Sequence, residues 1–402
     1  MQKISIIGDI MVEPPFMEQV SRDGKCDFWP SFEPLKVILE DSDYVIGNLE
    51  TPLAGVEAGY TDRIVSFNAP DVLVEALVKL GVDAVSTVNN HCLDRGYEGL
   101  VRTNEVLDKY GIAHTGTYPK GYEGERIHYF TVGDTKVALI AYTYATNATI
   151  NNVLLDDSNR DCVNLLRPQI GGISLYHRMP DHYYTTLAFV EEMAQRKLLW
   201  EETVKLKLAM KLPVAIIDDF IDEEEVALWF KKVEADYNEA RKKADIVLFY
   251  PHVGGQFNEE PGKYSQLMIQ KSAQLGFDGV FAAHSHTSQM ARFVEGKPCF
   301  YSMGNVTMSP GTFYSVSECL PEYGLGAHLY IDDKKVQKVT FSIFKMMEEN
   351  GEPLRVVPVD VLYNELDGEK QAALVKDVQS VYRRVTGCEL VDLVLRKEYD
   401  LL

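Results

Sequence analysis

The fold is decided by residues 71–111, which read DVLVEALVKLGVDAVSTVNNHCLDRGYEGLVRTNEVLDKYG. Within them, residues 71–80 and 99–110 place apolar residues three and four apart, and each stretch stops at a glycine, which predicts two amphipathic helices. Between the helices, the short β-branched run of residues 84–87 runs into a polar cluster and predicts a strand. Helices that alternate with such strands are typical of a layered α/β fold.

The same alternation extends over much of the chain. Residues 222–243 have a Glu-rich start and a Lys/Arg-rich end, which suits the helix dipole and predicts a helix. Six further apolar runs that end at turns or polar residues are predicted as strands: residues 4–7, 44–46, 136–141, 246–250, 279–282 and 299–301.

Two regions depart from this alternation. At about residues 151–212 a polar loop precedes a long helical pattern, which predicts a helical insertion able to cover a site. Residues 327–331 and 336–344 resemble a hairpin, and a helical tail is expected after them. We therefore expect one main domain over residues 1–345, including the insertion, and a mostly helical extension over residues 346–402.

Composition and charge limit the classes of function. The net charge of −20 repels polyanions, and no dense Lys/Arg cluster offsets it, so no nucleic-acid partner is expected. The six cysteines form no CxxC pair, which argues against a zinc knuckle and suits a reducing compartment. The apolar run at the start is too short for a signal peptide, and no other run is long enough for a transmembrane segment. The prediction is a cytoplasmic protein; its oligomeric state is left open.

Residues able to bind metals recur where the predicted strands end. Because the carboxyl ends of parallel strands meet at one edge of a sheet, these residues can converge although they are far apart in sequence. They are Asp9, Asn48, Glu50, Asn90, His91, His252, His284 and His286. Two neighbouring divalent ions need a bridging carboxylate, neutral imidazoles and an open face, and this set supplies the ligands. Manganese, iron or catalytic zinc fits a set without thiolates.

Each residue taken alone has a simpler interpretation. Asp9 could cap a turn or helix, Glu50 could be a surface acid, and Asn90 with His91 could form a hydrogen-bonded turn. The pair His284 and His286 is more specific, because alternate residues on an extended segment face the same side. This pair already favours a metal site on its own, and for the other residues the recurrence at successive strand ends favours a metal centre over these alternatives.

The ordered motifs resemble those of the bacterial CapA capsule-synthesis family, which is associated with poly-γ-glutamate and related to calcineurin-like metallophosphatases. The resemblance covers roughly the first 310 residues apart from the insertion. The matching segments are Gly8-Asp9-Ile10-Met11, Gly47-Asn48-Leu49-Glu50, Val88 to Gly96, Pro251-His252-Val253-Gly254, Ala283-His284-Ser285-His286-Thr287 and Tyr301-Ser302-Met303-Gly304-Asn305. This resemblance implies a two-sheet sandwich flanked by helices.

The resemblance also implies roles for individual residues. Glu50 would bridge two divalent ions that activate a water molecule, and His91, oriented by Asp94, would act as the general acid. Asn305 would line the pocket, and Arg95 is a candidate contact for the substrate. The remaining implied metal ligands are Asp9, Asn90, His252, His284 and His286.

The sequence also departs from the family pattern. Met11 stands where related phosphatases carry a second ligand histidine, which implies a less complete first metal site. Two functions stay open, ahead of a metal-free binding module, which would leave the recurrence of Asp, Glu, Asn and His unexplained. One is a metal-dependent phosphoesterase, and the other is a capsule-assembly protein that uses the same fold to bind an anionic polymer with little or no hydrolysis. The expected partner is an anionic small molecule or polymer.

Overall fold

Two β-sheets form the centre of the computed structural model, which describes residues 1–22, 24–63, 65–169, 179–348, 352–390, 392 and 394–401. The first sheet has the order β16-β15-β14-β1-β4-β5-β6, with β13 beside β1 and β17 beside β15. Its strands are β1 (Gln2–Ile10), β4 (Tyr44–Leu49), β5 (Ala84–Ser86), β6 (Ala113–Thr115), β13 (Asn305–Thr307), β14 (Tyr323–Asp332), β15 (Lys335–Met347), β16 (Arg355–Pro358) and β17 (Tyr399–Asp400).

The second sheet has the order β11-β12-β10-β9-β8-β7. Its central strands run parallel, and β7 and β11 pair antiparallel at its edges. The strands are β7 (His128–Val132), β8 (Thr135–Thr143), β9 (Ile246–His252), β10 (Gly279–Phe281), β11 (Ala291–Val294) and β12 (Lys297–Phe300). A separate small pair joins β2 (Ser21–Arg22) to β3 (Lys25–Cys26).

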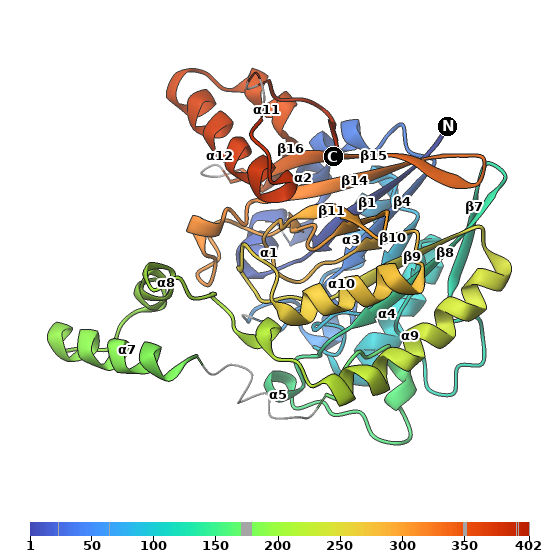
Figure 1. The fold of residues 1–402 in the computed structure, drawn as a ribbon, viewed down its shortest axis with the longest axis horizontal. Coiled ribbons are helices and arrows are strands. Elements are labelled where there is room, and N and C mark those ends of the chain that lie inside the picture. Colours follow the sequence, from blue (N-terminus) through green and yellow to red (C-terminus); the bar gives the residue numbers. More distant parts are fainter. Residues whose placement is uncertain are drawn as a thin grey trace.

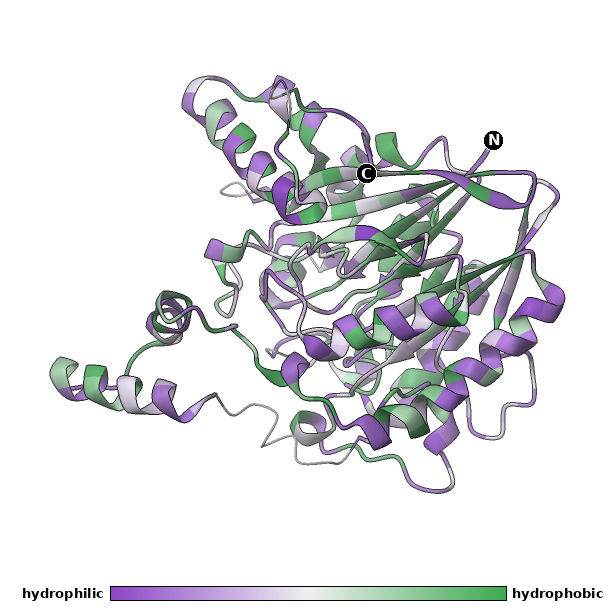
Figure 2. Ribbon diagram, in the orientation of Figure 1, coloured by the Kyte–Doolittle hydropathy of each residue, from purple (hydrophilic) through white to green (hydrophobic). Residues whose placement is uncertain are grey.

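Alternating side chains of the central strands pack into different layers. In β8, Val137 and Leu139 belong to the core between the two sheets, whereas Ala138 and Ile140 belong to the core beneath the helices of the second sheet. Both faces of this strand are therefore buried, which explains its continuous apolar sequence. Figure 2 shows the same division, with hydrophobic residues concentrated in the strands and hydrophilic ones dominating the outer helix α9 (Glu223–Lys243).

Helices flank both sheets (Figure 1). The second sheet is covered by α9 and α10 (Lys263–Leu275), and the first by α3 (Val72–Leu80) with α4 (Gly96–Tyr110). The other helices are α1 (Pro14–Val20), α2 (Trp29–Phe32), α5 (Ala148–Asn151), α7 (Asp181–Ala194), α8 (Trp200–Ala209), α11 (Val359–Glu365) and α12 (Gly368–Thr386). The 3-10 helices are η1 (Glu33–Ile38), η2 (Val56–Ala58), η3 (Arg160–Cys162), η4 (Ile217–Asp219) and η5 (Ser317–Cys319).

The layered two-sheet α/β fold predicted from the sequence is confirmed. Helix α3 ends at Gly81 and α4 at Gly111, each in the left-handed conformation that a glycine adopts without strain. Helix α9 begins after Asp222, whose side chain accepts a hydrogen bond from the Glu225 amide at 3.0 Å. These three helices lie where their patterns predict them.

Helices also occupy the predicted insertion and extension. Within the insertion, α7 projects away from the body of the molecule, while α8 packs nearer to it (Figure 1). The extension carries α11 and α12 and also two short strands, β16 and β17. The domain boundary itself stays a prediction. Among the described helices, none is both long and apolar enough to cross a membrane.

Candidate metal centre

The predicted ligands come together where strands of both sheets end. Asp9 lies near the end of β1 and His252 at the end of β9, while Glu50 directly follows β4. The loops that follow β5 and β10 contribute the other three: Asn90, His284 and His286. All six side chains are buried, with exposures of 4% or less. Parallel strands from two sheets thus bring distant sequence positions to one place.

Four of these side chains form one compact group. The Asn90 Oδ1 atom lies 2.7 Å from His252 Nε2 and 3.1 Å from His284 Nδ1. The two imidazole nitrogens lie 3.1 Å apart, and Glu50 Oε1 is 3.4 Å from His252 Nε2. Ligands about 2.0 to 2.3 Å from a common tetrahedral or octahedral ion are roughly 3 to 3.7 Å apart, so this group has the spacing of a coordination sphere.

A second group shares Glu50 with the first. It joins Asp9, Glu50 and His286, whose nearest ligand atoms all lie within 4.8 Å of one another. His286 Nδ1 is 3.5 Å from Asp9 Oδ2, and His286 Nε2 is 3.8 Å from Glu50 Oε1. Because Glu50 belongs to both groups, it stands where a carboxylate bridging two ions would stand.

Glu50 gives the clearest sign that a cation belongs here. Both of its carboxylate oxygens are buried and have no hydrogen-bond partner among the described residues. Burial and the Asp9 carboxylate together raise the pKa of Glu50 well above its usual value. A buried carboxylate without partners is costly, and a bound cation would remove that cost. The residues present therefore fit divalent metal binding.

The imidazoles respond to the same crowded, buried setting. Burial and the neighbouring His252 and His286 lower the pKa of His284 well below its usual value, so its ring is neutral, as a metal ligand must be. For Asp9, burial opposes ionisation, but the contact with His286, the neighbouring His252 ring and the hydrogen bond that Asn48 donates at 2.7 Å outweigh it and lower its pKa.

His91 faces the ligand groups without belonging to either of them. Its Nε2 atom lies 4.0 Å from Glu50 Oε1, and its Nδ1 atom lies 2.6 Å from Asp94 Oδ2. Phe67 stacks on the ring at a centroid distance of 4.2 Å, and its backbone amide donates to the same Asp94 oxygen at 2.6 Å. Asn151 donates to the other Asp94 oxygen at 2.6 Å. The His91 imidazole is thus fixed with its Nε2 atom directed toward the two ligand groups that share Glu50.

Two side chains outside the groups fix the other histidines. The Tyr144 hydroxyl lies 2.8 Å from His284 Nε2, which leaves Nδ1 directed toward Asn90. Asn305 Oδ1 lies 2.9 Å from His286 Nδ1, which leaves Nε2 directed toward Glu50. Such outer partners orient ligand histidines in metal sites. Tyr144 was not predicted, although it directly follows β8 and the strand-end pattern could have found it.

The backbone at the histidine pair differs from the expectation. An extended segment was predicted, but His284 and His286 both have positive φ angles, 109° and 53°. The prediction of an extended segment was wrong because these residues lie in a loop after β10 rather than in a strand. Such conformations cost on the order of 1–3 kcal/mol in non-glycine residues and collect at functional sites.

Three sequence-predicted residues lie at the margin of this centre. Asn305 is fully buried against His286 and is not among the described residues that line the cavity. Arg95 is engaged by the protein itself, because it donates to Ala58 O at 3.1 Å and to Ser66 Oγ at 2.7 Å. Met11 is buried in the core beside β13, and its backbone rather than its side chain bonds Thr307.

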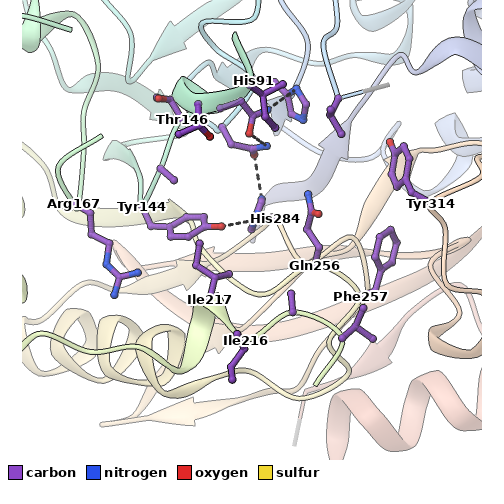
Figure 3. Close-up of a pocket in the computed structure, with 18 of the residues that line it drawn as sticks. His91, Tyr144, Thr146, Arg167, Ile216, Ile217, Gln256, Phe257, His284 and Tyr314 are labelled. Carbon is purple, nitrogen blue, oxygen red and sulfur yellow. Dashed lines mark hydrogen bonds between the residues drawn. The ribbon is translucent and has the colours of Figure 1, made fainter. Parts of the chain in front are cut away.

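A cavity of about 690 Å³ opens beside the first ligand group. Figure 3 shows His91 and His284 on one side of it, with Ile216, Ile217 and Phe257 on another. The predicted helical cover is found only in part, because α8 and the segment after it line the cavity, whereas α7 projects outward.

Comparisons with known proteins identify relatives over most of the chain. The family model described as bacterial capsule synthesis protein PGA_cap matches residues 3–309. The capsule biosynthesis protein CapA of Bacillus anthracis is 21% identical over 325 residues, which are 80% of this chain and 63% of that protein. The chain thus spans less than two-thirds of that relative.

A second relative and a solved structure are similarly distant. The PGA biosynthesis protein CapA of Bacillus subtilis is 21% identical over 330 residues, covering 80% of this chain and 67% of that protein. The structure of a 5'-nucleotidase from Candida albicans aligns with a TM-score of 0.40 and 12% identity, covering 95% of this chain and 57% of that chain.

Proposed function

The chain belongs to the bacterial capsule synthesis protein family, and from this premise and the geometry of its ligand groups we propose that it is a metal-dependent phosphoesterase. The observation that carries the proposal is the pair of ligand groups sharing Glu50, whose two oxygens have no hydrogen-bond partner among the described residues. Manganese, iron or zinc suits ligands made of carboxylate, amide and imidazole.

The roles of the side chains follow from their positions. Asn90, His252 and His284 would hold one ion, Asp9 and His286 the other, and Glu50 would bridge them. Bound divalent ions supply Lewis-acid stabilisation of phosphoryl charge and lower the pKa of water. With these ligands occupied, the charge of the buried carboxylates would be neutralised, and an anionic phosphate could approach despite the negative net charge of the chain.

His91 would act on the leaving group. Its Nε2 atom faces the ligand groups and the cavity, while Asp94 holds Nδ1 at 2.6 Å. This arrangement keeps a proton on Nδ1 and leaves Nε2 free to carry one to the departing oxygen. Asp94 is therefore a positioning residue, and Phe67 restricts rotation of the ring.

A phosphatase assay with a matched histidine pair tests the proposal. Turnover of p-nitrophenyl phosphate and bis-p-nitrophenyl phosphate with added Mn²⁺ should stop with a chelator and return with fresh metal. His91→Gln should lower kcat by roughly 10²- to 10⁴-fold while the protein keeps its metal. His114→Gln is the control, because His114 contacts Asp108 at 3.2 Å outside the centre. Bound metal without turnover of either ester would contradict the proposal.

The alternative is a capsule-assembly protein that binds an anionic polymer with little or no hydrolysis. Two observations favour it: two relatives carry capsule and PGA biosynthesis names, and Met11 offers no second ligand to the Asp9 group. Tight binding of γ-linked glutamate oligomers by metal-loaded protein that hydrolyses no ester would support this alternative.

A further inference from the structure

The cavity beside the ligand groups has two unlike sides. Asn90, His91 and His284 form its polar side, where a phosphoryl group would lie. The other walls come from residues 144–150, from the segment between Trp200 and Ile217, and from loops that carry Phe257 and Tyr314. Segments that lie far apart in the sequence thus enclose a space next to the metal centre.

Those other walls are mainly apolar. Among the described residues that line the cavity, none is Asp or Glu. Five lining side chains are aromatic: Tyr144, Trp200, Phe257, Phe313 and Tyr314. Aliphatic contacts come from Ile150, Met179, Val214, Ile216 and Ile217. A ligand part placed here would leave water for an apolar surface.

The two cations in the walls already have protein partners. Arg167 lies 3.2 Å from the Glu225 carboxylate and stacks over the Tyr264 ring at 3.7 Å. Lys207 donates to Val214 O at 2.9 Å and lies 5.5 Å from the centre of the Trp200 ring. A polymer with a carboxylate on every unit would lose water here without gaining free cationic partners, and this is costly.

We propose that the substrate is a phosphate ester of an apolar alcohol, with the phosphoryl group at the ligand groups and the apolar part in the cavity (Figure 3). This proposal rests on the phosphoesterase function above. In the hydrolysis, the bond between phosphorus and the ester oxygen breaks, and an oxygen from water forms the new bond to phosphorus while that water releases one proton to solvent. His91 gives its proton to the departing alkoxide oxygen, which leaves as the alcohol, and the imidazole is then reprotonated from solvent. The apolar cavity then binds the group that leaves.

The volume of the cavity indicates how large the apolar part of the ligand can be. About 690 Å³ lies within the range of roughly 300–1,000 Å³ of pockets that bury drug-sized ligands. Burying one methylene contributes about 0.8 kcal/mol, close to a fourfold change in affinity. Because the cavity is only partly enclosed, we expect the affinity to rise roughly two- to fourfold per methylene until the alkyl chain outgrows the walls.

A homologous ligand series tests the proposal without changing the phosphorus chemistry. n-Alkylphosphonates from methyl to octyl, which cannot be hydrolysed, are titrated calorimetrically into the Mn²⁺-loaded protein. The corresponding n-alkyl phosphates give kcat/KM. Dissociation constants should fall, and kcat/KM should rise, steadily with chain length. Equal values along the series would overturn the proposal, as would tighter binding of γ-linked glutamate oligomers than of octylphosphonate.

Matched isoleucine variants locate the effect. Ile150→Ser and Ile216→Ser replace apolar cavity walls and should flatten the dependence on chain length. Ile221→Ser is the control, because Ile221 is partly exposed, as Ile150 is, but is not one of the described lining residues. If the change in dissociation constant per added methylene is the same in both wall variants as in the wild type, binding in this cavity is contradicted. This change per methylene compares ligands within one protein, so a variant that is less active overall still gives a valid value.

The two readouts separate this proposal from the proposed function. If alkylphosphonates bind with the expected slope but no phosphate ester is hydrolysed, the cavity proposal for binding stands and the phosphoesterase function fails. If esters are hydrolysed at rates independent of chain length, the function stands and the apolar substrate class is refuted.

Discussion

Replacing Glu50 by Gln should remove the response of the protein to metal with little effect on the metal-free fold. An amide has nearly the shape of a carboxyl group, and neither oxygen of Glu50 has a hydrogen bond to lose among the described residues. In chelator-treated protein we therefore expect the free energy of unfolding to change by about 1 kcal/mol or less. With metal, the difference should be large, because Glu50 belongs to both ligand groups.

The size of the metal effect follows from mass action. An ion present at 100 times its dissociation constant stabilises the folded state by about 2.7 kcal/mol per site. The unfolding entropy of a 402-residue chain is on the order of 0.8 kcal/mol per kelvin, so two occupied sites should raise Tm by about 6 °C. The Glu50→Gln variant should show little of this rise.

Differential scanning fluorimetry with chelator and with Mn²⁺ measures the effect. Glu13→Gln is a matched control, because Glu13 is also fully buried but bonds Ser309 and Thr312 rather than the ligand groups. The control should keep the full metal-dependent rise in Tm. An equal rise in Glu50→Gln would refute the shared-ligand arrangement.

Three further substitutions test separate parts of the structure. Tyr144→Phe removes the hydroxyl 2.8 Å from His284 Nε2 and should weaken metal binding by roughly 10- to 100-fold, measured by competition with a metal indicator; unchanged affinity would contradict an orienting role. Asp94→Asn should lower kcat by about 10²-fold with full metal content, measured by assay beside elemental analysis, and an unaltered kcat would show that His91 needs no orientation. His328→Gln should make the stability of the fold less sensitive to acid. Burial, and then Lys3, lower the pKa of His328 to about 3 in the folded protein. Between pH 6.5 and 3 only the unfolded chain therefore binds a proton at this residue, so the wild type loses stability as the pH falls. In urea unfolding, the variant should lose up to about 1.4 kcal/mol per pH unit less than the wild type, and parallel slopes would refute this assignment.

Strands were predictable where both of their faces are buried. Residues 136–141 were expected as a strand, and β8 (Thr135–Thr143) extends them by a few positions. Helix α10 was not predicted, because its buried face includes Ser265 and Ser272 and so dilutes the apolar pattern. A helical tail was expected over residues 364–386, and α12 occupies most of this range from Gly368, which has a φ of +50°. Helix α11, which ends just before it, was not predicted.

The sequence could predict which residues form the candidate centre, because they lie at strand ends. It could not predict how their backbone and side chains are oriented. Asp9 and His252 lie at the ends of buried strands and Glu50 directly follows one, and the register of the parallel strands brings them together. The left-handed backbone at His284 and His286 depends on how the loop meets Asp9, whose Oδ2 atom accepts from the His284 amide at 3.0 Å. Sequence periodicity carries no information about such tertiary contacts.

The most direct test is the metal content of the protein purified without chelator, measured by elemental mass spectrometry beside Glu50→Gln. The arrangement of Asp9, Glu50, Asn90 and the three histidines predicts two divalent transition-metal ions per wild-type chain, and a marked loss in the variant. Wild-type protein that holds no metal even after Mn²⁺ is added would contradict the metal centre, and with it the proposed hydrolysis.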